Sequence, residues 1–195
     1  VVVNSGCANT ATGRAGYVDI RRIVKRAEEV LHLPRGRVLA ASTGIVGVPL
    51  PVPKIMAGLE RLRPRFGGGR KAARAIMTTD LAPKEASRRV WFRRRTFIVG
   101  GMCKGAGMIH PNMATLIVVL TTDASASKAV LGRLLSRAVE SSFNRMTVDG
   151  DQSTNDACYL LANGAWGGPT ARSLESPLAR ALGRALQEVC IELAR

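Results

Sequence analysis

Apolar residues recur every three or four positions in several stretches of the chain, a spacing that is typical of helices with one buried face. The longest stripe ends at the sequence LPRG, whose proline and glycine stop a helix, and another stripe occupies the last residues. Asp123, Ser125 and Ser127 are candidate N-caps for a third stripe. The pattern predicts helices over residues 17–33, 55–62, 71–80, 127–142 and 177–195.

Short apolar runs rich in β-branched residues predict strands. The clearest is ATLIVVLTTDA, residues 114–124, which is too short and too β-branched for a helix. Residues 100–112 are rich in glycine and predict a long loop. Helices and strands mix without a strict βαβ rhythm, which predicts an α+β or layered α/β fold. Further strands are predicted at 1–3, at 38–43, at 88–93 and 95–100 with a tight turn near Arg94, and on both sides of a polar turn within 144–162.

The length and composition of the chain limit its class. Its 195 residues can form one sizeable core or two small ones. No apolar run approaches the roughly 20 residues that cross a bilayer, so no membrane segment is expected. The first stretch, VVVNSGCAN, is not a signal peptide and starts as if inside a strand, so we expect a fragment or a processed piece.

The cysteine and charge content argues against metal and nucleic-acid sites. The four cysteines, at positions 7, 103, 158 and 190, are widely spaced without a CxxC pair, and only two histidines are present. We therefore expect reduced, mostly buried thiols and no metal site. The net charge is +15, but nucleic-acid-binding motifs are missing, so nucleic acid is not an expected partner. The run RRVWFRRR, residues 88–95, is more typical of a charged edge strand.

Two polar segments are candidate parts of a site. DGDQSTND begins at Asp149 like a calcium-binding loop, but Thr154 and Leu160 stand where that loop needs glycine and glutamate. We interpret it as a hydrogen-bonded turn that shapes a site. NSGCANTATG, residues 4–13, lacks the Gly-Lys-Ser/Thr of a phosphate-binding loop, and is either a structural turn or a site wall.

Residues 42–44, Ser-Thr-Gly, directly follow a predicted strand. The Thr43 hydroxyl and the Gly44 amide can converge on one oxygen, which is the chemistry of an oxyanion hole. Ser-Thr-Gly is equally good turn chemistry, so this motif alone is a weak signal.

The stretch KGAGMIHPNMAT, residues 104–115, is the most specific one. Gly105 and Gly107 are expected to adopt backbone conformations that are closed to other residues. Lys104 supplies a cation that suits a substrate carboxylate. His110 is either a general base or, beside a proline, a structural residue.

The threonine that ends this stretch is the candidate nucleophile. An internal threonine is a poor nucleophile, but Thr115 follows the small Ala114, whose carbonyl is sterically open. Cleavage of the bond between them would free the α-amine of Thr115, which titrates near ~8 and can take the hydroxyl proton. This chemistry links self-cleavage and catalysis to one residue.

At this stretch the chain resembles the glutamate N-acetyltransferase / ornithine acetyltransferase family, whose autocleavage segment KGAGMIHPNMAT matches. The resemblance runs from end to end of the chain. It implies a layered fold of the N-terminal-nucleophile type, with mixed sheets packed against helices. Six further segments fit the family in the expected order: NSGCANTATG, ASTGIVGVPLP, AIMTTD, LTTDA, SFNRMTVDGDQSTND and EVCIELAR.

The resemblance also implies an enzyme of arginine biosynthesis that cleaves itself between Ala114 and Thr115. Thr115 would take the acetyl group from N-acetylornithine and pass it to glutamate through an acyl-enzyme, in a ping-pong reaction. Thr43 and Gly44 would form the oxyanion hole, and Lys104 would bind substrate. No cofactor is implied, although acetyl-CoA is a donor for some members. The bacterial family is cytoplasmic and assembles as an α₂β₂ tetramer of cleaved chains.

Two features depart from the family pattern. Leu81 in TTDLAPK stands where the family has a substrate-contacting threonine, and leucine cannot supply that hydroxyl. Family members are roughly twice as long, so we expect the chain to be incomplete at both ends. Residues 1–114 would be the C-terminal part of the α chain, and residues 115–195 the N-terminal part of the β chain.

Two other functions stay open at this point. One is a related self-processing hydrolase or aminopeptidase, in which water takes the acyl group instead of glutamate. The other is an inactive fragment whose basic surface binds polyanions. Acetyl transfer to labelled glutamate would separate transferase from hydrolase, and a steep salt dependence of nucleic-acid binding would favour the polyanion binder.

Overall fold

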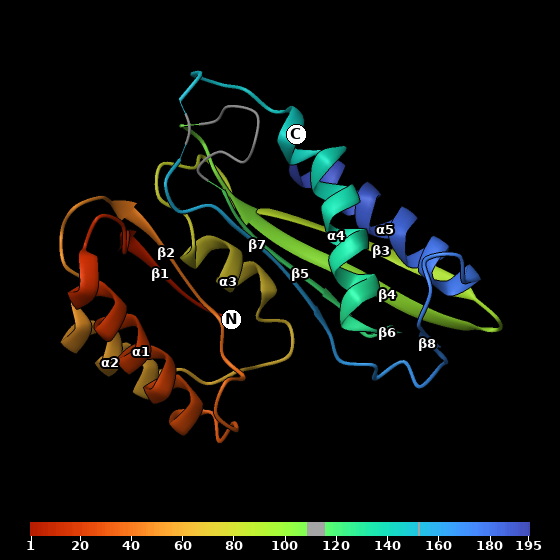
Figure 1. Ribbon diagram of the computed structural model, residues 1–195, viewed down its shortest axis with the longest axis horizontal. Coiled ribbons are helices and arrows are strands. Elements are labelled where there is room, and N and C mark those ends of the chain that lie inside the picture. Colours follow the sequence, from red (N-terminus) through yellow and green to blue (C-terminus); the bar gives the residue numbers. More distant parts are fainter. Residues whose placement is uncertain (109–115, 152) are drawn as a thin grey trace.

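The computed structural model describes residues 1–108, 116–151 and 153–195, and shows helices packed in layers against β-sheets (Figure 1). This architecture confirms the expected α+β or layered α/β class. The helices are α1 (Gly13–Val30), α2 (Val52–Arg61), α3 (Gly69–Ala75), α4 (Lys128–Glu140), the short 3-10 helix η1 (Phe143–Arg145) and α5 (Pro177–Leu193). The strands are β1 (Val2–Cys7), β2 (Ala40–Ile45), β3 (Lys84–Phe92), β4 (Arg95–Lys104), β5 (Ile117–Thr122), β6 (Ser125–Ala126), β7 (Ala157–Ala162) and β8 (Thr170–Ala171).

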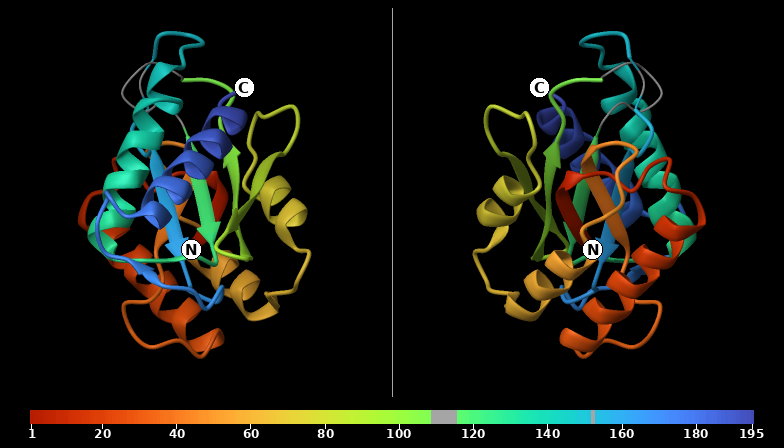
Figure 2. Two further views of the ribbon diagram at one scale, coloured as in Figure 1. Left: turned by 90° about the vertical axis from the view of Figure 1, so that its right-hand side faces the viewer. Right: turned by 90° about the vertical axis from the view of Figure 1, so that its left-hand side faces the viewer.

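The central layer is a four-stranded sheet with the strand order β3-β4-β5-β7. β3 and β4 form an antiparallel hairpin, β5 is antiparallel to β4, and β7 is parallel to β5. Helices α4 and α5 lie on one face of this sheet, whereas α3 and the parallel pair β1–β2 lie on the other (Figures 1 and 2). Helices α1 and α2 pack together with the β1–β2 pair.

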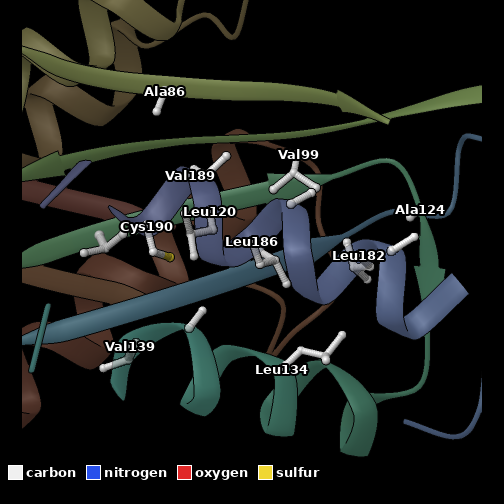
Figure 3. Close-up of a cluster of buried hydrophobic side chains, with 14 of the residues drawn as sticks. Ala86, Val99, Leu120, Ala124, Leu134, Val139, Leu182, Leu186, Val189 and Cys190 are labelled. Atoms are coloured by element: carbon white, nitrogen blue, oxygen red, sulfur yellow. The ribbon is translucent and has the colours of Figure 1, made fainter. Parts of the chain in front are cut away.

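Two separate hydrophobic cores support these layers. The larger core lies between the four-stranded sheet and helices α4 and α5, where Leu182, Leu186 and Val189 of α5 are fully buried (Figure 3). These residues belong to the apolar stripe that predicted the last helix. The smaller core joins Ile23 of α1 to Leu59 of α2. The residues with described positions therefore form one sizeable core and one small one.

Serine side chains cap the N-termini of two helices. The Oγ of Ser127 accepts a hydrogen bond of 3.4 Å from Val130 N at the start of α4. The Oγ of Ser176 accepts one of 3.2 Å from Ala179 N at the start of α5. Of the three predicted caps for α4, the structure uses Ser127. Across the described ranges, every helix is too short or too polar to cross a membrane.

The arginine-rich hairpin confirms two predictions. Its tight turn is formed by Arg93 and Arg94, which both have left-handed backbones with φ of 45° and 63°. β3 lies at the edge of the sheet, as expected for its charged residues. Arg88 of β3 forms ion pairs with Glu188 and Glu192 of α5, at 3.1 and 2.7 Å, so part of the positive charge is paired between the strand and the helix.

Two boundaries and one strand predicted from the sequence are wrong. β1 continues to Cys7, into residues expected to form a loop, because they pair with β2. β4 continues through Gly101 to Lys104, where the glycines suggested a loop. A Cβ at Gly101 would lie 2.5 Å from Cδ2 of Leu120, so glycine serves close packing there instead of a turn. The first strand expected within 144–162 is replaced by η1 and irregular chain, and only β7 forms.

Truncation of Leu186 tests the larger core. Leu186→Ala removes a fully buried side chain and should lower the free energy of unfolding by about 2–5 kcal/mol. Gln187→Ala, on the exposed side of the same helix, should change it by less than about 0.5 kcal/mol. Urea denaturation followed by far-UV circular dichroism measures both, and equal effects would contradict this orientation of α5.

Candidate active site

The end of β4 meets β2 in the interior, between the four-stranded sheet and the β1–β2 pair. Lys104 is the last residue of β4, and its Nζ donates a hydrogen bond of 3.0 Å to Oγ1 of Thr43 in β2. Both residues are buried, with 2% and 1% of their surface exposed. The structure therefore brings together two predicted site residues. It also corrects the expectation that Lys104 lies in a loop, because β4 extends to it.

Burial shapes the chemistry of this contact. Loss of water lowers the pKa of Lys104 below its ordinary value, and the nearby Asp80 and Asp156 oppose that shift. Because the lysine donates to Thr43, the hydroxyl proton of Thr43 stays available for a second acceptor. A hydroxyl polarised in this way suits the stabilisation of an oxyanion.

Gly44 allows β1 and β2 to approach closely. Its φ is +124°, and a Cβ built on it would lie 2.2 Å from the carbonyl carbon of Gly6, its partner in the strand register. Packing therefore requires glycine at position 44, independently of any role of its amide in an oxyanion hole.

The segment NSGCANTATG, residues 4–13, supports the site strand. Asn9 N donates a hydrogen bond of 2.7 Å to Oγ of Ser42. The side chain of Asn9 donates to the Gly16 carbonyl at 3.0 Å and accepts from Oγ1 of Thr12 at 2.7 Å. Residues 4–7 of the segment therefore belong to β1, and residues 8–12 form a structural turn at the start of α1 that contacts β2 directly before the predicted oxyanion residues.

Side chains in and just before β7 donate to carbonyls of β2. Asn155 Nδ2 donates to the Ser42 carbonyl, and the Tyr159 hydroxyl donates to the Ala40 carbonyl at 2.8 Å. Burial raises the pKa of Tyr159, which keeps the phenol protonated as a donor. Together with the lysine contact, these bonds hold β2 against the four-stranded sheet.

Asp156 holds the chain at the start of β5. Its Oδ1 accepts a hydrogen bond of 2.7 Å from Leu116 N. Burial raises the pKa of Asp156, while the Leu116 amide and the charge of Lys104 act against this shift. The sheet register places Ile117 opposite Lys104. Because Leu116 follows Thr115 directly, the residue next to the candidate nucleophile is anchored near the lysine.

Both backbone polar groups of Gly105, the residue after Lys104, are hydrogen-bonded to side chains. Asp80 Oδ1 accepts a hydrogen bond of 2.6 Å from Gly105 N, and Lys84 Nζ donates one of 2.9 Å to the Gly105 carbonyl. Leu81, which follows Asp80, is fully exposed and lines an open cleft of about 570 Å³ together with Lys84 and Gly105. Leu81, where the chain departs from the family pattern, therefore lies in the same cleft as Lys84 and Gly105.

The turn DGDQSTND reaches the predicted cleavage stretch. Neither Gly105 nor Gly107 has a positive φ, so the expectation of glycine-only conformations there is wrong. Met108 has the left-handed backbone instead, with φ of 55°. Its amide donates to Oδ2 of Asp149 at 2.5 Å, which fixes this backbone by hydrogen bonding. The contact fits the interpretation of DGDQSTND as a turn that shapes a site.

The predicted cleavage site, Ala114–Thr115, and His110 lie outside the described residues. The division of the chain at 114/115 and the N-terminal-nucleophile chemistry therefore stay predictions.

All four cysteines are free thiols, as expected. Cys103 and Cys190 are buried, and burial raises the pKa of Cys103 to about 11 and that of Cys190 to about 12. They are therefore protonated and inert at neutral pH. Cys7 and Cys158 are half-buried. Among residues with described positions, His, Cys, Asp and Glu side chains form no group of three suited to a metal ion.

The sequence analysis did not single out Asp80 or Lys84, and it included Asn155 and Asp156 only as part of the turn DGDQSTND. A weak signal was present for Asn155 and Asp156, because they directly precede the apolar run ACYLLA just as Thr115 directly precedes the apolar run LIVVL. Parallel neighbouring strands begin at the same edge of a sheet. The parallel pairing of β5 with β7 is a tertiary feature, however, and no local sequence pattern predicts it.

Comparison with known proteins identifies relatives over the whole chain. A family model described as the ArgJ family matches residues 1–195. The arginine biosynthesis bifunctional protein ArgJ of Dehalococcoides mccartyi is 46% identical over 196 residues, which cover 100% of this chain and 48% of that protein. The protein of the same name from Thermus thermophilus is 47% identical over 198 residues, with 100% and 48% coverage. The chain thus spans about half the length of the curated relatives it matches.

Among solved structures, the chain is similar to the crystal structure of arginine biosynthesis bifunctional protein ArgJ from Bacillus halodurans. The TM-score is 0.55 and the sequence identity 39%. The match covers 57% of this chain and 60% of that chain.

The lowered pKa of Lys104 predicts a pH dependence of stability. Below its folded-state pKa the buried ammonium opposes folding, and this penalty is relieved as the pH rises through that pKa toward 10.5, the ordinary value. The free energy of unfolding of the wild type should therefore rise relative to Lys104→Met from neutral pH toward 10.5. Urea titrations at several pH values measure it. Lys54→Met, on the exposed side of α2, is the control for loss of a surface charge, and a pH-independent difference for Lys104→Met would contradict the prediction.

Proposed function

The chain belongs to the ArgJ family, and on that premise we propose that it carries the catalytic centre of a self-processing acetyltransferase of arginine biosynthesis. The observation that supports this most is the buried contact of Lys104 with Thr43, near the anchored Leu116. This contact places a polarised hydroxyl and a cation close to the start of β5. Leu116, the residue before β5, directly follows Thr115 in the sequence.

In the proposed self-cleavage, Oγ of Thr115 attacks the carbonyl carbon of Ala114. The C–N bond between the two residues breaks, the Thr115 amine takes the hydroxyl proton, and an ester joins Ala114 to Oγ. Water then hydrolyses this ester and leaves a carboxylate on Ala114 with a free hydroxyl and α-amine on Thr115. Each step passes through an oxyanion, which hydrogen-bond donors at Thr43 and Gly44 would stabilise.

In the proposed transfer, the free α-amine takes the hydroxyl proton as Oγ of Thr115 attacks the acetyl carbonyl of N-acetylornithine. The amide bond breaks, and ornithine leaves with that proton on its amine while the acetyl group stays on Oγ as an ester. The amine of glutamate then attacks the ester, and N-acetylglutamate leaves as Oγ recovers a proton. Lys104 and the cleft at Leu81 are the proposed substrate contacts.

The proposal extends to the assembly and the setting of the protein. The cleaved parts, residues 1–114 and 115–195, would stay together in an α₂β₂ tetramer in the cytoplasm. The mechanism uses no cofactor, and acetyl-CoA is a candidate second acetyl donor.

Replacement of the nucleophile tests the cleavage. A denaturing gel of the wild type should show fragments of residues 1–114 and 115–195, the second with Thr115 at its N-terminus by sequencing. Thr115→Ala should stay whole because it lacks the attacking oxygen. Thr121→Ala, an exposed threonine of β5, is the matched control and should cleave like the wild type. A wild-type chain that stays whole would refute self-processing.

The same preparation distinguishes transferase from hydrolase. With N-acetylornithine and labelled glutamate, we expect labelled N-acetylglutamate. Release of free acetate without labelled product would replace the transferase by the related hydrolase.

Restoring the hydroxyl at position 81 tests the proposed substrate contact. Leu81→Thr should lower KM for N-acetylornithine by about 2- to 10-fold, the equivalent of one hydrogen bond of about 0.5–1.5 kcal/mol, with little change in kcat. Leu81→Val has the shape of threonine without the hydroxyl and should keep the wild-type KM. Equal KM values for the threonine and valine variants would exclude a hydroxyl contact at this position.

A further inference from the structure

Three aspartates hold backbone amides on the two sides of residues 109–115. Hydrogen bonds to a carboxylate are shorter and stronger than those between neutral groups, so each acts as a firm anchor. Asp80 lies before β3, whereas Asp149 and Asp156 are the first and last residues of the turn DGDQSTND. The pairs are Asp80 with Gly105, Asp149 with Met108 and Asp156 with Leu116, at donor–acceptor distances of 2.6, 2.5 and 2.7 Å.

Asp156 is the anchor next to the proposed nucleophile. Leu116 is 4% exposed, and its carbonyl accepts a hydrogen bond of 2.9 Å from Ala157 N, so adjacent residues hold both of its backbone groups. The preceding Asn155 donates to the Ser42 carbonyl. One segment of three residues therefore ties the start of β5 to the strand that carries the proposed oxyanion hole.

We propose that Asp156 is a positioning residue for self-cleavage, an inference that rests on the proposed function. The nitrogen of Leu116 is bonded to the carbonyl carbon of Thr115, so anchoring this amide restricts where Oγ of Thr115 can lie relative to the scissile carbonyl. The attack is fast only near one geometry, and a displacement of about 1 Å costs on the order of 10²-fold in rate.

An anchor of this kind needs an acceptor oxygen and no charge. Asparagine keeps a carbonyl oxygen that can accept from the Leu116 amide, whereas alanine leaves this amide without its partner. Asp156→Asn and Asp156→Ala therefore separate anchoring from electrostatic or proton-transfer roles. Asp123 provides a matched control, because its Oδ1 accepts a hydrogen bond of 2.7 Å from Ile98 N at the opposite end of the same sheet.

The first measurement is the rate at which the fragments 1–114 and 115–195 appear. Asp156→Ala should cleave on the order of 10²-fold more slowly than the wild type. Asp156→Asn should stay within a few-fold of the wild-type rate, and Asp123→Ala should match it. Circular dichroism shows whether each variant is folded.

The second measurement does not depend on cleavage. In the Thr115→Ala background, which keeps the chain whole, the Leu116 amide should exchange with solvent deuterium slowly. Asp156→Ala should speed this exchange by about tenfold, as expected for one lost hydrogen bond, while Asp156→Asn should not. The amides of α5 should stay protected in every variant.

The outcomes separate this inference from the proposed function. Wild-type cleavage in Asp156→Ala overturns the inference, and so does an Asp156→Asn chain as slow as Asp156→Ala, because charge would then be the requirement. A whole wild-type chain with the expected exchange pattern refutes the proposed function but supports the anchor. If Asp156→Ala does not fold, Asp156→Asn decides the question, because anchoring requires near wild-type cleavage and slow Leu116 exchange from it.

Discussion

The hydrogen bond between Lys104 and Thr43 is the contact on which the arrangement of the two layers depends. Both side chains are almost inaccessible to water, and a buried amine or hydroxyl without a partner costs far more than a paired one. The hydrophobic cores on the two sides of this contact are separate clusters. Directional polar bonds, with Asn155 and Tyr159 also donating to β2, therefore fix how β2 sits on the four-stranded sheet. That position in turn decides where the proposed oxyanion hole lies.

Charged side chains have different roles at the surface and near the contact between Lys104 and Thr43. On the surface, Arg88 and Arg26 form ion pairs with glutamates, but such exposed pairs contribute little to stability. Nearer the proposed site, the half-buried carboxylates of Asp80 and Asp156 accept hydrogen bonds from backbone amides on either side of the proposed cleavage site. These two acidic residues therefore organise the backbone, whereas the surface glutamates mainly pair with exposed arginines.

The elements that were predictable are those whose signal is repeated along the chain. The apolar stripe of α5 and the serine cap of α4 are local, so periodicity and capping placed both helices within a few residues. Errors arose where one residue type has two uses. Gly101 suggested a loop, but it lies inside β4. Glycine occupies this strand position because a side chain there would collide with Leu120. Gly105 and Gly107 suggested special backbone angles, which the structure shows at Met108 instead.

The sequence by itself determined most helices, the buried strand β5 and the family of the chain, because periodicity and motifs are properties of consecutive residues. It also indicated Thr43 and Lys104 as candidate site residues. Only the tertiary structure decided that Lys104 and Thr43, which are 61 positions apart in the sequence, form a hydrogen bond. The same holds for the hydrogen bond between Asp156 and Leu116, which are 40 positions apart. These two hydrogen bonds depend on how β2 packs on the four-stranded sheet and on the parallel pairing of β5 with β7. Both are set by packing and buried hydrogen bonds between distant segments, for which a single sequence carries no local pattern.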